Sequence, residues 1–199
     1  MSAIGLNSSR TLFGLAVVAL AAWPTPLFAN PQSLPAELAV QASDAETILR
    51  LDSGEPFHRT VDAVTGARVI DVPNSTVKLV VWSEVAASGE TTPFYAISLD
   101  GRSVVAVKPT SYFLKLRHGD FDPAVRVPPV ETELAADETT RLFIVQFATQ
   151  PLEEFRTAIE DLGGTVYHFL ADHAYIVKMD AETQQRVAAL PFVRWVAAA

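Results

Sequence analysis

The stretch from Arg141 to Val196 has the clearest pattern of apolar and polar positions in the chain. Short runs rich in β-branched and aromatic residues alternate in it with two runs of helical spacing, in the order β-α-β-β-α-β. This is the order of the split βαβ pattern found in ferredoxin-like sandwiches. We therefore predict an α+β protein whose residues 140–199 form a ferredoxin-like βαββαβ sandwich.

Local signals place the two helices within this stretch. The first has an apolar stripe at helical spacing, formed by Leu152, Phe155, Ile159 and Leu162. Thr149 is its expected N-cap, and Gly163-Gly164 is expected to end it, because glycine adopts the left-handed conformation at a helix C-terminus without strain. Asp180 is expected to cap the second helix.

Residues 44–123 have the spacing of several short strands separated by turns, and we expect a small antiparallel β-rich domain, either a sandwich or an open barrel. The run Thr76–Trp82 mixes apolar and polar residues in the manner of a half-buried strand. Asp100-Gly101 lies between two apolar runs and favours a hairpin with a two-residue turn.

The remaining segments are expected to be a leader and two linkers. Residues 1–29 resemble a signal peptide, with an apolar run of about 12 residues from Leu12 and a small residue, Ala29, at a plausible cleavage point. An uncleaved N-terminal anchor is the alternative. Residues 30–43 are expected to be a linker, and residues 124–139, which contain Pro128-Pro129, a Pro-rich linker between two domains. The expected location is secreted or periplasmic.

Composition narrows the chemistry that the chain can perform. It has no cysteine, a formal net charge of −8 and a pI near 4.9. The absence of cysteine excludes disulfides and thiolate chemistry, and the excess of acidic residues argues against binding to nucleic acid or to an anionic membrane. We expect no cofactor and no membrane partner after removal of the signal peptide.

Motifs that could carry catalysis or bind a metal are weak. Asp52-Ser53-Gly54 occurs in proteases but lacks its partner motifs, and Ser103 lacks the second glycine of a nucleophile elbow. Two groups of residues could be imagined as metal ligands, but neither has a recognised spacing: they are His118, Asp120 and Asp122, and His168, Asp172 and His173. Asn74-Ser75-Thr76 fits a glycosylation acceptor or a plain turn. We predict that the protein is not an enzyme and holds no metal.

If both helices pack on one face of the four-stranded sheet, no element of residues 140–199 covers the opposite face. Ile144 and Ile176 are expected on that face, with Val166 or Val193 as further candidates. Exposed β-branched residues there would form a partner surface. The preceding β-rich domain could equally well cover them.

The C-terminal stretch resembles the propeptides of subtilisin-type serine proteases and the related stand-alone inhibitors. The resemblance lies in Ile144-Val145-Gln146-Phe147, Gly163-Gly164, the strand Tyr175 to Met179, and the ending Pro191-Phe192-Val193-Arg194-Trp195-Val196. It implies a chain that binds a subtilisin-type protease, in cis or in trans, and inhibits it or helps it fold.

By this resemblance, the open sheet face would pack on the protease and the C-terminal tail would lie along its substrate cleft. The implied partner-binding residues are Ile144, Gln146, Ala174 and Ile176 on the face, and Ala197, Ala198 and Ala199 in the tail. Two alternatives remain: an N-terminal fragment of a secreted subtilase precursor, and a general exported protein-interaction module.

Overall fold

The computed structural model describes residues 38–43, 45–52, 54–116, 119–129, 139 and 141–198. These residues all lie within one compact unit that spans Ser33–Ala199. The signal peptide expected at residues 1–29 lies outside the described residues. In the part of the chain that is described, no helix has the length and apolar character needed to cross a membrane.

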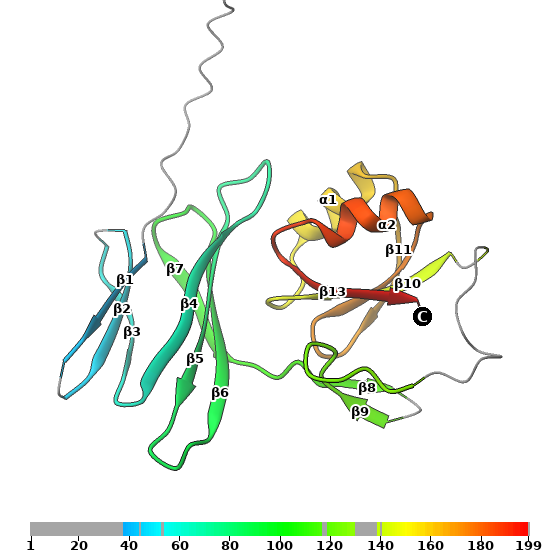
Figure 1. Ribbon diagram of the computed structural model, residues 1–199. Coiled ribbons are helices and arrows are strands. Elements are labelled where there is room, and N and C mark those ends of the chain that lie inside the picture. Colours follow the sequence, from blue (N-terminus) through cyan, green and yellow to red (C-terminus); the bar gives the residue numbers. More distant parts are fainter. Residues whose placement is uncertain are drawn as a thin grey trace, which may run out of the picture. The chain divides into compact units, whose positions relative to one another are not determined.

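The N-terminal half of this unit consists of two antiparallel sheets (Figure 1). The first has three strands in the order β1-β2-β3: β1 (Leu38–Ala42), β2 (Thr47–Leu51) and β3 (Pro56–Thr60). The second has four strands in the order β4-β5-β6-β7: β4 (Ala63–Asp71), β5 (Lys78–Val85), β6 (Thr91–Ser98) and β7 (Val104–Pro109). Strands β1 and β3 have no prominent pattern in the sequence. The linker expected at residues 30–43 is therefore wrong for Leu38–Ala42, which pair with β2.

An apolar cluster joins the two sheets. Leu49 and Leu51 of the first sheet pack with Val80, Trp82 and Ala96 of the second, and all five are buried. This arrangement agrees with the expected β-rich region and gives it a sandwich form.

Strand β5 is buried on both faces, which corrects the expectation of a half-buried strand. Val80 and Trp82 face the first sheet, whereas Leu79 and Val81 belong to a second apolar cluster on the other face. A strand covered on both sides needs a nearly continuous apolar run, and this explains why the period of two is weak here.

A hairpin does connect β6 and β7, but its turn is longer than two residues. Ser98 pairs with Val104, and the side chain of Asp100 accepts hydrogen bonds from the backbone N–H groups of Arg102 and Ser103, at 2.8 and 2.7 Å. Those bonds lower the pKa of Asp100 to about 2. The aspartate side chain thus organises a wider loop in which only Gly101 has positive φ (74°).

The C-terminal half has the predicted βαββαβ order. Its elements are β10 (Leu142–Phe147), α1 (Glu153–Asp161), β11 (Thr165–Leu170), β12 (Ala174–Lys178), α2 (Ala181–Ala188) and β13 (Val193–Ala198). The four strands form one antiparallel sheet in the order β11-β12-β10-β13. Both helices lie on the same face of this sheet (Figure 1).

The helices bury the expected stripe, with Phe155 and Ile159 of α1 and Val187 of α2 all at 0% exposure. Asp180 caps α2 by accepting a hydrogen bond from the N–H of Thr183 at 2.7 Å, as predicted. Thr149 does not cap α1: the N-cap position is Leu152, which makes no side-chain cap. The residue before a proline is disfavoured in the helical conformation, so Gln150, which precedes Pro151, does not begin the helix, and α1 starts three residues after the expected position.

The second apolar cluster continues from the four-stranded sheet of the sandwich into the βαββαβ sheet. Leu79, Tyr95 and Ile97 belong to the same cluster as Phe147 and Phe192. The boundary predicted at residues 124–139 therefore does not divide the apolar core. Asp122 to Arg126 form a turn closed by backbone bonds to Asp122, and residues 130–138 lie outside the described residues.

Candidate functional site

The sheet face opposite the helices is not open. A small hairpin made of β8 (Leu114–Leu116) and β9 (Gly119–Phe121) lies against it, on the side away from α1 and α2 (Figure 1). Leu114 packs with Ile144 and Ala174, which are 5% and 0% exposed. The alternative in which the preceding β-rich region covers this face is the one that the structure shows.

The predicted partner-binding residues are therefore mostly inaccessible. Ile144, Gln146 and Ala174 are buried, and Ile176 is half-buried. Trp195, on the neighbouring strand, is half-buried and makes an edge contact with Phe121 of the hairpin. The expectation of an exposed face is wrong because the hairpin supplies its own apolar side chains to the sheet.

A polar cluster fastens the hairpin segment to the sheet, and Gln146 is at its centre. The Nε2 group of Gln146 donates to the backbone oxygens of Tyr112 (2.9 Å) and Asp172 (3.2 Å). Its Oε1 accepts from Nη1 of Arg194 at 2.9 Å. Every polar atom of this fully buried amide thus has a partner, which is the condition for burying it without a large penalty.

Arg194 extends the cluster to the segment that follows the hairpin. Its guanidinium forms a two-pronged pair with the carboxylate of Asp122, at 2.7 and 2.9 Å. It also lies 4.1 Å from the centre of the Tyr112 ring, whose hydroxyl donates to the backbone oxygen of Ala148 at 2.7 Å. Burial raises the pKa of Tyr112 although Arg194 and Arg68 oppose the shift. Arg194, Tyr112 and Asp122 were not predicted as a group, because they are far apart in the sequence.

The predicted tail is part of the sheet. Ala197 pairs with Ile144, and Ala198 pairs with Phe143, so both belong to strand β13 and are half-buried. Ala199 lies outside the described residues. In this structure Ala197 and Ala198 are therefore not a free extended tail.

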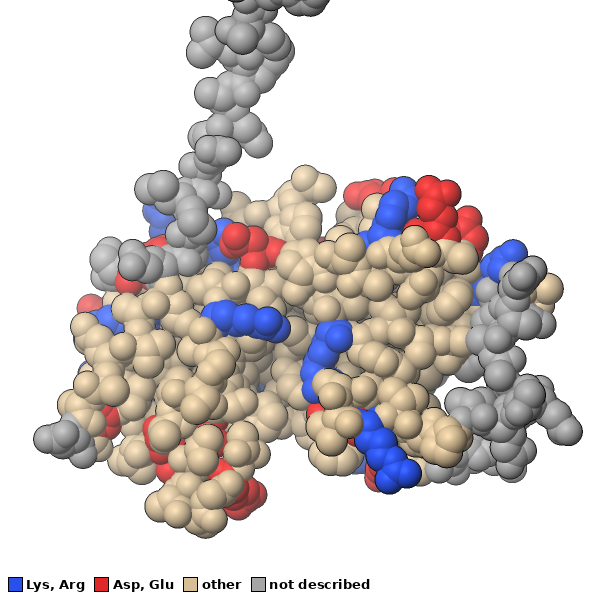
Figure 2. Space-filling model, in the orientation of Figure 1, with Lys and Arg blue, Asp and Glu red and all other residues tan. Residues whose placement is uncertain are grey.

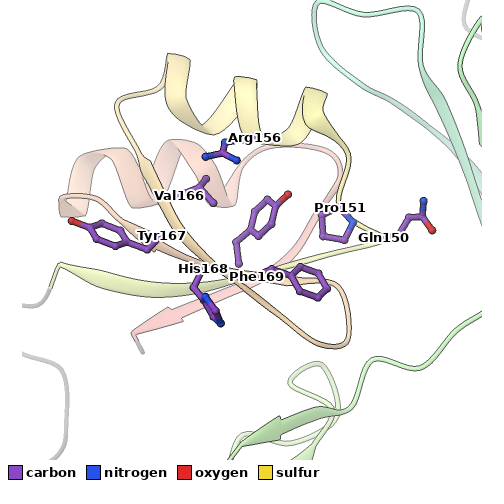
Figure 3. A pocket seen from close by; sticks show the side chains of 8 residues that line it. Gln150, Pro151, Arg156, Val166, Tyr167, His168 and Phe169 are labelled. Carbon is purple, nitrogen blue, oxygen red and sulfur yellow. The ribbon is translucent and has the colours of Figure 1, made fainter.

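The most exposed aromatic side chains of the βαββαβ unit lie at the other edge of the sheet. Tyr167 and Phe169 of β11 are 60% and 56% exposed. They border a groove of about 450 Å³ between β11 and the start of α1 (Figure 3), lined by Gln150, Pro151, Arg156, Val166, Tyr167, His168, Phe169 and Tyr175. Sequence reasoning missed this groove, although an aromatic strand that contains no charged residue was a signal for it.

Arg156 is the charged residue of this groove. It reaches from α1 toward Val166, while His168 points to the opposite side of the strand (Figure 3). Its Nε donates to Glu160 at 3.1 Å, and this carboxylate raises the pKa of the guanidinium. Burial raises the pKa of Tyr175 at the groove floor, with Arg156 opposing the shift. On the face shown in Figure 2, acidic and basic side chains lie together over the helices.

Further polar contacts join the sandwich to the loops of the βαββαβ unit. The carboxamide of Gln150 accepts from Tyr95 and from Lys108, both at 3.1 Å. His173 contacts the hydroxyl of Thr110 at 2.5 Å, and burial lowers the pKa of its imidazole. These residues hold the two halves together through the same loops that end β10 and begin β12.

The weak catalytic and metal motifs do not converge. Asp120 is exposed on β9, Asp122 is paired with Arg194, and Asp172 and His173 occupy a turn with φ of 62° and 65°. Ser53 and His118 lie outside the described residues. Within the part of the chain that is described, no three acidic or histidine side chains are arranged to hold a metal ion.

Comparison with known proteins gives one match. A model of a family described as a domain of unknown function, DUF8729, matches residues 115–199. No curated protein and no solved structure matches the chain. The matched segment begins within β8, so it contains the second strand of the covering hairpin together with the whole βαββαβ unit.

Proposed function

We propose that this chain is an exported, non-catalytic protein that binds a subtilisin-type serine protease, in cis or in trans, and inhibits it or helps it fold. Its C-terminal unit is a ferredoxin-like sandwich of the subtilase-propeptide type. The observation that carries this proposal is the βαββαβ order combined with the strand order β11-β12-β10-β13. The residues that carry the resemblance also take core positions that fit such a unit, as Val145, Phe147, Val177 and Phe192 are fully buried.

The covered face sets a condition on how the protease docks. The sheet face that would meet the protease contacts Leu114 of the hairpin, and Arg194 ties the segment beyond the hairpin to the sheet. A protease can dock on this sheet face only if the β8–β9 hairpin moves away from it. The exposed fraction of Ile144, which is 5% in this structure, would then rise, and Gln146 would lose its bond to Tyr112.

A direct titration tests the proposal. The full chain is added to a subtilisin-type protease, and complex formation, peptide hydrolysis and the yield of refolded protease are measured. We expect a complex at micromolar concentration, with either slower hydrolysis or a higher refolding yield. The absence of all three effects at micromolar concentration would refute the proposal.

A pair of variants tests the docking face. Ile176→Arg places a charge on the covered face, and Gln185→Arg places the same charge on an exposed position of α2, on the other side of the sheet. We expect Ile176→Arg to weaken the complex and Gln185→Arg to leave it unchanged. Equal effects would show that the protease does not use this face.

A general protein-interaction module is the second candidate, and the occupied face and paired tail favour it. In that case the chain would show no effect on a subtilisin-type protease, yet it would bind polypeptide through a surface that is exposed in the folded chain. The groove beside β11 is such a surface.

A further inference from the structure

Strand β11 is an edge strand with unusual side chains for that position. Among the described residues, β12 is the only strand that pairs with it. Exposed edges usually carry lysine, proline or other charges that prevent pairing with another chain. The sequence of β11 is TVYHFL, which contains neither proline nor an acidic or basic residue other than His168.

The local geometry directs the aromatic side chains outward. The pairing of β11 with β12 shifts register between Val166 and His168, so Tyr167 is a bulged residue. Bulges commonly redirect a side chain at a sheet edge. Tyr167 therefore projects from the strand (Figure 3). The ring centres of Phe169 and Tyr175 are 6.4 Å apart.

The groove combines a free backbone edge, an apolar floor and one cationic group. Val166, Phe169 and Tyr175 supply the apolar surface, and Arg156 supplies the charge. No aspartate or glutamate lines the groove itself, but Glu160 pairs with Arg156, and Glu153 lies near enough to influence the pKa of both Arg156 and Tyr175. The bond of Arg156 to Glu160 uses only its Nε among the described contacts, so both Nη groups can donate to a second carboxylate.

We propose that the β11 edge and its groove bind an extended segment of a partner polypeptide, with an acidic side chain of that segment directed at Arg156. The partner's backbone pairs with the regular part of β11, from His168 to Leu170, as in other cases of strand addition. Its apolar side chains pack on Phe169 and Tyr175. This site uses the exposed edge of the sheet rather than its covered face, and it holds whether or not the partner is a protease.

Charge complementarity favours such a segment over a second copy of this chain. A copy that paired through its own β11 would bring TVYHFL to the groove, and that strand has no carboxylate for Arg156.

Binding of a defined peptide to the full chain tests the proposal. The probe is a fluorescein-labelled hexapeptide, Thr-Val-Glu-Val-Thr-Val, measured by fluorescence anisotropy. A second probe has glutamine in place of glutamate, and a third is methylated at alternate backbone nitrogens. We expect the first to bind, the glutamine probe to bind about tenfold more weakly, and the methylated probe not to bind.

Matched variants locate the site. Phe169→Ser and Arg156→Gln are compared with Phe113→Ser, which removes an aromatic ring of similar exposure (52%) before β8. Circular dichroism first establishes that each variant is folded. We expect the first two variants to weaken binding of the glutamate probe at least fivefold, and Phe113→Ser to have no effect. Arg156→Gln should also remove the preference for glutamate over glutamine.

Amide hydrogen exchange supplies a readout that does not depend on substitutions, because strand addition should slow exchange in residues 168–170. Equal affinity for the methylated probe, no difference between the glutamate and glutamine probes, or no binding of any probe would overturn the proposal. Concentration-dependent dimerisation abolished by Phe169→Ser would also overturn it, because a second copy would then occupy the edge. None of these outcomes depends on the protease titration.

Discussion

The buried amide of Gln146 provides the sharpest test of how the hairpin is held on the sheet. Replacing it by leucine keeps a side chain of similar size and removes three hydrogen bonds, to Tyr112, Asp172 and Arg194. Arg194 keeps its ion pair with Asp122. The main loss of hydrogen bonding is therefore at the backbone oxygens of Tyr112 and Asp172, which Gln146 no longer contacts.

The expected loss of stability follows from the two backbone oxygens that Gln146→Leu leaves without a hydrogen bond. A buried polar group that loses its hydrogen bond costs about 1–3 kcal/mol, so two such oxygens cost about 2–6 kcal/mol. Burial of the leucine side chain returns about 1.5–3 kcal/mol. We therefore expect Gln146→Leu to lower the free energy of unfolding by about 2 kcal/mol, which is a large part of the total stability of about 5–15 kcal/mol typical of a folded protein.

Urea denaturation followed by tryptophan fluorescence measures this change. Trp195 contacts Phe121 of the hairpin, so its emission reports on the same contact. Gln185→Leu on the exposed face of α2 is the control, for which the expected change is below about 0.5 kcal/mol. Equal stability of the two variants would show that Gln146 does not hold the hairpin and that the argument from satisfied hydrogen bonds is wrong.

Two other substitutions test the packing of the helix end and a buried carboxylate. Gly164→Ala would place a Cβ atom 2.6 Å from Cγ2 of Ile159, so we expect a loss of about 1–3 kcal/mol in thermal or urea unfolding, whereas Gly89→Ala meets no atom within 4 Å and tests only its positive φ. Although burial acts to raise the pKa of Glu84, hydrogen bonds from Trp82, Thr60 and His58 lower it below 4.5 overall. A lowered folded-state pKa contributes stability that is present above about pH 4.5 and is lost as the pH falls through the folded value. The Glu84→Gln variant should therefore have a lower free energy of unfolding than the parent chain at pH 7. Between pH 5 and pH 3 its free energy of unfolding should fall less than that of the parent. Parallel curves of unfolding free energy against pH for the two proteins would contradict this.

The sequence by itself determined the C-terminal unit because its signals are local. The stripe with Phe155 and Ile159, the capping aspartate Asp180 and the left-handed Gly163 each depend on neighbours within a few residues. The order βαββαβ follows from those signals. Thr149 is not the cap, because Gln150 precedes Pro151 and is disfavoured in the helical conformation that a cap at Thr149 would require.

Only the tertiary structure decided which surfaces are exposed. Whether Ile144 and Ala174 face solvent depends on where Leu114 lies, about thirty residues earlier in the chain for the first and sixty for the second, and no local pattern carries that information. The same holds for Gln146, whose partners Tyr112 and Arg194 come from both sides of it in the sequence. Burial of a residue depends on the elements that pack on it. The sequence alone therefore predicted the sheet, whereas the tertiary structure decided that its face is covered and that the β11 edge is exposed.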